Sequence, residues 1–249
     1  MRKHWLLMSI VAVLTVCRAA VAYAQTVDEI VEKYLAASGG RAAFEKLTSR
    51  VVTGTISVST PAGELSGTIE VYNKGPLKQR TLVKIDAAQL GIGQIVQDQR
   101  FNGTSGYAID SINGNREMTG DQLATARNNS FPSPLLNYKE NGTKIELLGR
   151  EKVGDKDAYV LQMSPKTGPA GRLFIDVDTN LIVKTVVTVD APPVGTIEQT
   201  LTMSDYRDVD GVKVPYKIRS SNQFQDVSIT VTKVVQNSPI DDQMFSKPE

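Results

Sequence analysis

From residue 49 to the end of the chain, hydrophobic and polar residues alternate with a period of two, which is typical of β-strands. The apolar members of four such runs are Val52, Ile56 and Val58; Ile69 and Val71; Val83 and Ile85; and Val227, Ile229 and Val231. Turn-forming residues separate the runs at 61–63 (Pro-Ala-Gly), 113–114 (Asn-Gly), 154–155 (Gly-Asp), 178–180 (Asp-Thr-Asn) and 210–211 (Asp-Gly). We count about eleven strands with short connections, which predicts a large antiparallel meander in a mainly β fold.

Before residue 49 the apolar residues recur with the spacing of a helix. Thr26 and Glu29 have the spacing of a capping box. The apolar stripe that follows is Val27, Ile30, Val31, Tyr34 and Leu35. Glycines at 39 and 40 end this helix, and residues 41–47 predict a second, short one that turns Phe44 inward. The two helices either cover the core or act as a lid.

One segment interrupts the strands. Residues 119–129 predict a short helix, and residues 131–138 (Phe-Pro-Ser-Pro-Leu-Leu-Asn-Tyr) form a loop rich in apolar side chains. Such a loop is either buried beneath another element or serves as a mobile flap over an apolar pocket.

A sheet of about eleven twisted strands curls, and its concave face must be filled. The N-terminal helices and the central insert are the segments available to fill it. We therefore predict a curved antiparallel half-barrel with the helices on its concave side, with room for an apolar cavity between them.

The first 24 residues have the features of a secretory signal peptide. A cationic start (Arg2, Lys3) precedes an apolar run from Trp5 to Cys17, and Ala22-Tyr23-Ala24 forms a cleavage site. Cys17 has an alternative interpretation as a lipoprotein anchor, which Val16 disfavours because the residue before such a cysteine is normally small. We expect a periplasmic or secreted protein whose single domain spans residues 25–249.

Composition narrows the chemistry of this mature chain. The only histidine, tryptophan and cysteine are His4, Trp5 and Cys17, so none remains after cleavage. Ser-His pairs, thiolate nucleophiles and imidazole or thiolate metal sites are thereby excluded. We predict no catalytic residues, no metal and no cofactor.

The charge balance makes nucleic acid an unexpected partner. The signal segment holds three basic residues and no acids, so the 28 basic and 27 acidic residues of the whole chain become 25 and 27. No basic block or stripe stands out.

Four stretches of the mature chain resemble the periplasmic lipoprotein-carrier superfamily, the LolA/LolB-like proteins, and their uncharacterised relatives in outer-membrane lipoprotein sorting. These are 27–47, with two glycines between apolar helices; 67–76, a strand that ends in Lys74 near a proline; 101–110, with Phe-Asn-Gly leading to a tyrosine; and 204–215 together with 239–245. The resemblance implies a hydrophobic cavity under a helical lid. It also implies that Lys74, the nearest match to the carriers' basic residue, is the lid latch.

This resemblance leads to a hypothesis of function: binding or transport of a hydrophobic ligand such as a lipid, an acyl chain or the lipid moiety of a lipoprotein. The residues expected to line the ligand site are Leu35, Phe44, Leu90, Ile92, Phe131, Leu135, Leu136 and Tyr138. Each can equally belong to an ordinary core. We expect a charge at Leu135 or Phe131 to abolish ligand retention and leave the fold standing, whereas loss of folding would favour the core.

Two other functions remain open. The chain can be an exported interaction or sensor module without a lipid ligand, or a hydrolase-type enzyme that uses carboxylate, Lys, Tyr or Ser groups. We expect a monomer that meets a membrane-associated partner protein, and no enzyme.

Overall fold

The computed structural model describes residues 25–60, 63–191 and 195–248, and the predicted signal peptide with Cys17 lies outside them. Within these residues thirteen strands form one antiparallel sheet in the order β6-β5-β4-β3-β2-β1-β13-β12-β11-β10-β9-β8-β7. The strands are β1 (Ser49–Thr60), β2 (Gly63–Lys74), β3 (Lys78–Ala87), β4 (Gly93–Phe101), β5 (Gly106–Asp110), β6 (Arg116–Glu117), β7 (Lys144–Val153), β8 (Lys156–Ser164), β9 (Gly171–Asp176), β10 (Ile182–Ala191), β11 (Gly195–Val209), β12 (Val212–Ser221) and β13 (Asp226–Gln236). The sheet therefore has more strands than the predicted eleven. One of them, β6, has only two residues, which is too few to show an alternating pattern.

The helices are α1 (Val27–Ala37), α2 (Arg41–Glu45) and α3 (Gly120–Asn128), with 3-10 turns η1 (Ala88–Leu90) and η2 (Asp242–Phe245). The predicted capping box of α1 is confirmed: Thr26 and Glu29 each accept a hydrogen bond from the other's backbone N–H. α2 is two residues shorter than expected.

Four of the predicted turns lie between strands as expected. The turn between β11 and β12 shows why its sequence suits it: Asp210 and Gly211 both have positive φ, at 49° and 82°. Two such residues in succession match the twist of a hairpin. The remaining turn, at 61–63, lies partly outside the described residues.

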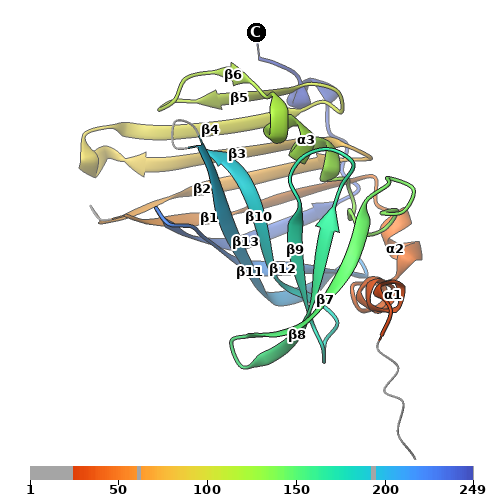
Figure 1. Cartoon of the computed structure of the whole chain (residues 1–249). Coiled ribbons are helices and arrows are strands. Elements are labelled where there is room, and N and C mark those ends of the chain that lie inside the picture. The colour runs from red at the N-terminus through yellow and green to blue at the C-terminus, as the bar shows by residue number, and fades with distance from the viewer. Residues whose placement is uncertain (1–24, 61–62, 192–194, 249) are drawn as a thin grey trace, which may run out of the picture.

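The sheet curves strongly around its concave face (Figure 1). β3 and β4 are separated from β10 and β11 by four strands of the sheet order, yet both pairs line the same cavity. β6 and β7, at the two ends of the order, each pair with one strand only, so the barrel stays open. The predicted half-barrel is thus confirmed.

The helices lie on the concave side, as predicted. Strand alternation and register place Leu161 and Leu173 on the same face as Gln199, which lines the cavity. Leu161 belongs to the cluster that buries Ile30 and Leu35 of α1. Figure 1 shows α1 and α2 beside β7, and α3 between β3 and β9.

Close strand packing at the centre of the sheet depends on Gly67 of β2. A Cβ atom there would lie 2.0 Å from the backbone carbonyl oxygen of Lys84 on β3. We expect Gly67→Ala to lower the free energy of unfolding by about 1–3 kcal/mol, because a rigid backbone must move. Thermal unfolding should show a fall of roughly 3–10 °C. The neighbouring Ser66→Ala is the control, and equal melting temperatures for the two variants would contradict this account.

Candidate functional site

An apolar floor covers the concave face of the sheet's central strands. Its buried members are Ile56, Val58, Leu65, Ile69, Val83, Ile85, Ala87, Ile95 and Val227. Apart from Ala87, each keeps 5–9% of its surface exposed, whereas most side chains under α1 keep 3% or less. Two partly buried apolar side chains pack against this floor among the described residues. They are Val71 and Ile229, which belong to the strands that form the floor. Within the described residues, no apolar side chain from outside these strands packs against the floor, and the concave side above it is called the groove below.

A cavity of about 410 Å³ lies between α3 and the strands β3, β4, β10 and β11. Its volume lies within the usual range of ligand pockets, about 300–1,000 Å³. Many of its lining side chains are neutral and polar, with Gln79, Thr81 and Gln99 on β3 and β4 facing Gln199 on β11. The polar side chains of this cavity, called the mouth of the groove below, lie on the same face of the sheet as the apolar floor.

Gln79 is one of the residues that hold α3 over this mouth. The Gln79 side-chain amide donates to the Ala126 carbonyl oxygen at 2.8 Å and accepts from the Asn129 amide at 3.1 Å. The Gln99 amide lines the cavity and has no hydrogen-bond partner within the described part of the chain.

A second apolar cluster, called the lid cluster below, forms where α1 and α2 pack with the 131–138 loop on β8 and β9. It contains six of the eight predicted ligand residues: Leu35, Phe44, Leu135, Leu136 and Tyr138 are buried, and Phe131 is partly buried against them. The loop is therefore packed beneath α1 and α2. None of the six lines the cavity under α3, and their role as ligand contacts stays a prediction.

The other two predicted residues lie elsewhere. Leu90 ends η1 and Ile92 lies in the turn before β4, not in central strands, and their exposed fractions are 38% and 58%. Gly91 and Gly93 have positive φ, which turns the chain at the end of the β3–β4 hairpin and leaves both side chains outside the groove.

Arg41 of α2, which sequence reasoning missed, ties the lid cluster together. Its guanidinium donates to both carboxylate oxygens of Glu32 on α1, at 3.1 and 2.5 Å, and to the Leu136 carbonyl oxygen at 2.9 Å. Such a fork is the geometry that suits arginine. In the sequence, Arg41 directly follows the two glycines that separate the helices, and this position could have indicated its role.

Lys74, the predicted latch, holds another segment. Strand alternation places it on the convex face, because its neighbour Asn73 is the register partner of Gln79 on the concave face. The Lys74 ammonium donates to the Ile240 carbonyl oxygen at 2.8 Å and to the Asp242 carboxylate at 2.7 Å. Lys74 therefore fastens the C-terminal segment, and its role as a lid latch stays a prediction.

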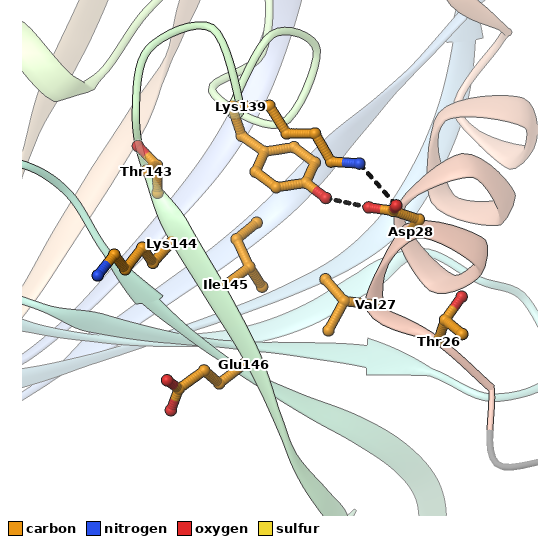
Figure 2. A pocket seen from close by; sticks show the side chains of 9 residues that line it. Thr26, Val27, Asp28, Lys139, Thr143, Lys144, Ile145 and Glu146 are labelled. Atoms are coloured by element: carbon orange, nitrogen blue, oxygen red, sulfur yellow. Dashed lines mark hydrogen bonds and ion pairs between the residues drawn. The ribbon is translucent and has the colours of Figure 1, made fainter.

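A shallow hollow of about 510 Å³ lies between the first turn of α1 and the start of β7 (Figure 2). At its edge the Asp28 carboxylate accepts from the Lys139 ammonium at 2.6 Å and from the Tyr138 hydroxyl. These bonds join α1 to the end of the 131–138 loop on the outside of the lid cluster.

The Asp28 contacts predict a pH dependence of the lid cluster. The hydrogen bonds from Lys139, and then from Tyr138, hold the pKa of Asp28 below its ordinary 3.8 against the opposing effect of burial. A carboxyl group whose pKa is lower in the folded state contributes stability above pH 3.8, and this is lost as the pH falls below that value. We expect Asp28→Asn to lower the melting temperature by a few degrees at most at pH 7.

The melting temperatures of Asp28→Asn and of the original protein should converge as the solution is acidified below pH 3.8. Glu151→Gln, on the exposed face of β7, is the control and should match the original protein throughout. A difference for Asp28→Asn that stays constant down to pH 3 would show that the carboxylate's charge plays no part.

The buried acids have structural roles. Asp98, on the convex face, is 3% exposed and lies 2.7 Å from both Arg80 and Arg100. Burial raises its pKa, but the hydrogen bonds from the two arginines outweigh this and keep the pKa low. Asp98 thus remains an ionised counter-ion, not a general acid.

Two further observations concern the described residues alone. They contain no group of three or more His, Cys, Asp or Glu side chains placed to hold a metal ion. None of their helices has the length and hydrophobicity needed to cross a membrane.

The fold is that of the LolA superfamily. A LolA superfamily protein from Nitrosomonas europaea superposes with a TM-score of 0.57 and 16% identity, covering 90% of this chain and 99% of that one. A putative outer membrane lipoprotein-sorting protein domain from Vibrio parahaemolyticus gives a TM-score of 0.54 and 10% identity, covering 87% and 94%. The fold predicted from the resemblance is confirmed. A family model described as an uncharacterized protein matches residues 137–249, and no curated protein matches the sequence.

Proposed function

We propose that this protein binds a hydrophobic ligand, such as a lipid, an acyl chain or the lipid moiety of a lipoprotein, in the groove on its concave face. The observation that carries the proposal is the floor: eight branched apolar side chains on five neighbouring strands, each 5–9% exposed and none covered by an apolar side chain from outside these strands among the described residues. Likeness to a lipoprotein-sorting domain supports the same class of ligand.

The mechanism is sequestration. Moving an acyl chain from water onto an apolar surface contributes roughly 0.8 kcal/mol per methylene group, so partial burial of a long chain gives micromolar binding. α3, held by the hydrogen bonds of Gln79 and Asn129, lies over the mouth of the groove, so its displacement controls entry. We expect no catalysis in this process.

The setting of this activity is part of the proposal. In it, residues 1–24 are a cleaved signal peptide and residues 25–249 a single domain that acts in the periplasm or outside the cell. A membrane-associated protein that receives or delivers the lipid would act on the lid cluster.

A tryptophan reporter tests this function, because residues 25–249 contain no native tryptophan. Leu201 on β11 lies on the concave face, two residues from Gln199, whereas Thr230 on β13 is exposed on the convex face. Addition of 1-dodecanol should shift the emission of Leu201→Trp to shorter wavelength and leave that of Thr230→Trp unchanged. Equal behaviour of both reporters would contradict binding in the groove.

A second function, strand addition by a partner polypeptide, is favoured by the free edge of β7. This strand pairs only with β8, and Leu148 at its bulge is 57% exposed. An open edge strand is a template for another chain. A photo-crosslinker at Leu148 should then capture one defined exported protein, and the same group at Ile112, which is also exposed, should not.

A further inference from the structure

Arg50 of β1 is a partly buried cation that forms no hydrogen bond or ion pair within the described residues. Its Nε and Nη2 atoms are inaccessible to solvent and have no hydrogen-bond partner. Its guanidinium carbon lies 5.5 Å from the centre of the Phe131 ring, beneath the lid cluster. Because buried donors are almost always hydrogen-bonded, two orphan donors on one charged group require an explanation.

Arg50 also has no counter-ion among the described residues. Burial lowers the pKa of Arg50, and the only titratable group that acts on it by charge is the Tyr34 hydroxyl. Other partly buried arginines of this chain differ, since Arg80 and Arg100 share Asp98. Withdrawing a guanidinium from water without a counter-ion is destabilising, and a bound anion would offset that cost.

The groups around Arg50 are neutral and polar. Its register partner on β13 is Gln236, whose Oε1 is buried without a hydrogen bond. The buried Tyr34 hydroxyl lies against the hydroxyls of Ser38 and Ser133. The hydroxyls can donate to an anionic oxygen, and none of these neutral groups competes for the charge of Arg50.

Register connects this cluster to the ligand groove. Arg50, Asn73 and Gln79 are successive partners across β1, β2 and β3 on the concave face, so they form one polar row. The next rows along the strands become apolar, ending at Ile56 and Val58. Eight residues separate Arg50 from Val58, about 27 Å at 3.4 Å per residue. The groove is therefore polar and cationic at the end beneath the lid cluster and apolar at the other.

We propose that Arg50 binds the anionic head group, a carboxylate or a phosphate, of an amphiphilic ligand whose chain lies along the apolar floor. This inference rests on the proposed function and specifies its ligand class and orientation. The polar row places the head under Phe131 and the lid cluster, and the tail runs toward Val58. A ligand that enters neutralises the charge that the free protein leaves unpaired.

The test compares ligands that share one chain. Binding of dodecanoate, dodecyl phosphate and 1-dodecanol to residues 25–249 is measured by calorimetry, with acetate and inorganic phosphate as anions without a chain. We expect at least one anionic amphiphile to bind about tenfold or more tightly than dodecanol, as charge-assisted hydrogen bonds provide. Arg50→Gln should reduce this preference to less than about twofold and leave dodecanol binding unchanged.

Arg219→Gln is the matched control, because Arg219 lies on the convex face and pairs with Asp226 at 3.2 Å. It should keep the full preference. A preference that survives in Arg50→Gln, or equal binding of all three amphiphiles by the original protein, overturns the inference while the proposed function stands. Binding of acetate or phosphate as tightly as the amphiphiles also overturns it. If no amphiphile binds, the proposed function itself fails.

A second measurement does not depend on any ligand. Arg50→Met removes the unpaired charge and keeps the apolar stem, so the ligand-free variant should melt at the same temperature as the original protein or above it. A fall of more than about 5 °C would mean that Arg50 is paired in the free protein, which overturns the inference.

Discussion

Ile229→Lys is expected to abolish ligand binding without unfolding the protein. Ile229 lies near the middle of β13, opposite Ile56 on one side and Ile218 on the other, and is partly buried against the floor. In the empty groove a lysine can extend its charge into solvent. A bound acyl chain would desolvate that charge, so affinity for 1-dodecanol should fall about a hundredfold or more.

Ser228→Lys is the matched control, one residue away on the convex face and exposed. It adds the same charge to the same strand and should bind as the original protein does. Circular dichroism should show the same strand content in both variants. A folded Ile229→Lys protein with unchanged affinity would mean that the ligand, if any, binds elsewhere.

Leu135→Asp is expected to prevent folding. Leu135 has no exposed surface and packs with α1 and β8 in the lid cluster. The lost apolar contacts and a carboxyl group buried among aliphatic side chains together cost more than about 4 kcal/mol. That is a large share of the stability of a typical domain, roughly 5–15 kcal/mol. This reverses the expectation from sequence that a charge here would spare the fold.

The control is Leu148→Asp, at a leucine that is 57% exposed on β7. Its stability in urea should lie within about 0.5 kcal/mol of the original protein. Leu135→Asp should instead show no cooperative transition. If it unfolds cooperatively near the original midpoint, the lid cluster opens readily and the loop is the flap that its composition also allowed.

Local patterns were sufficient to predict most elements of this fold. The Thr26–Glu29 capping box and the Asp210-Gly211 turn depend on residues next to one another in sequence, and both are confirmed. The curvature followed from a general property of long twisted sheets. These features need no knowledge of distant contacts.

The site depended on distant contacts and was predicted less well. Leu35 and Leu135 are apolar and buried as expected, but only the course of the sheet shows that they fill the lid cluster while Ile85 faces the groove. The alternation at Gln79, Thr81, Val83 and Ile85 contained the signal for an amphipathic wall, because its polar and apolar members share one face.

Arg50 could not be recognised from its neighbours. It occupies an alternating position in β1, where a single arginine usually reaches solvent. Its burial is produced by Tyr34 and Phe131, which approach from α1 and from the loop before β7.

The central claim is that the groove holds an amphiphile, and native mass spectrometry of residues 25–249 tests it most directly. The protein would be purified from a periplasm without detergent, and anything bound would be extracted into solvent and identified. We predict a stoichiometric adduct whose extract is a lipid or acyl compound with an anionic head group. A bare polypeptide mass that stays unchanged after incubation with total membrane lipids would contradict the account.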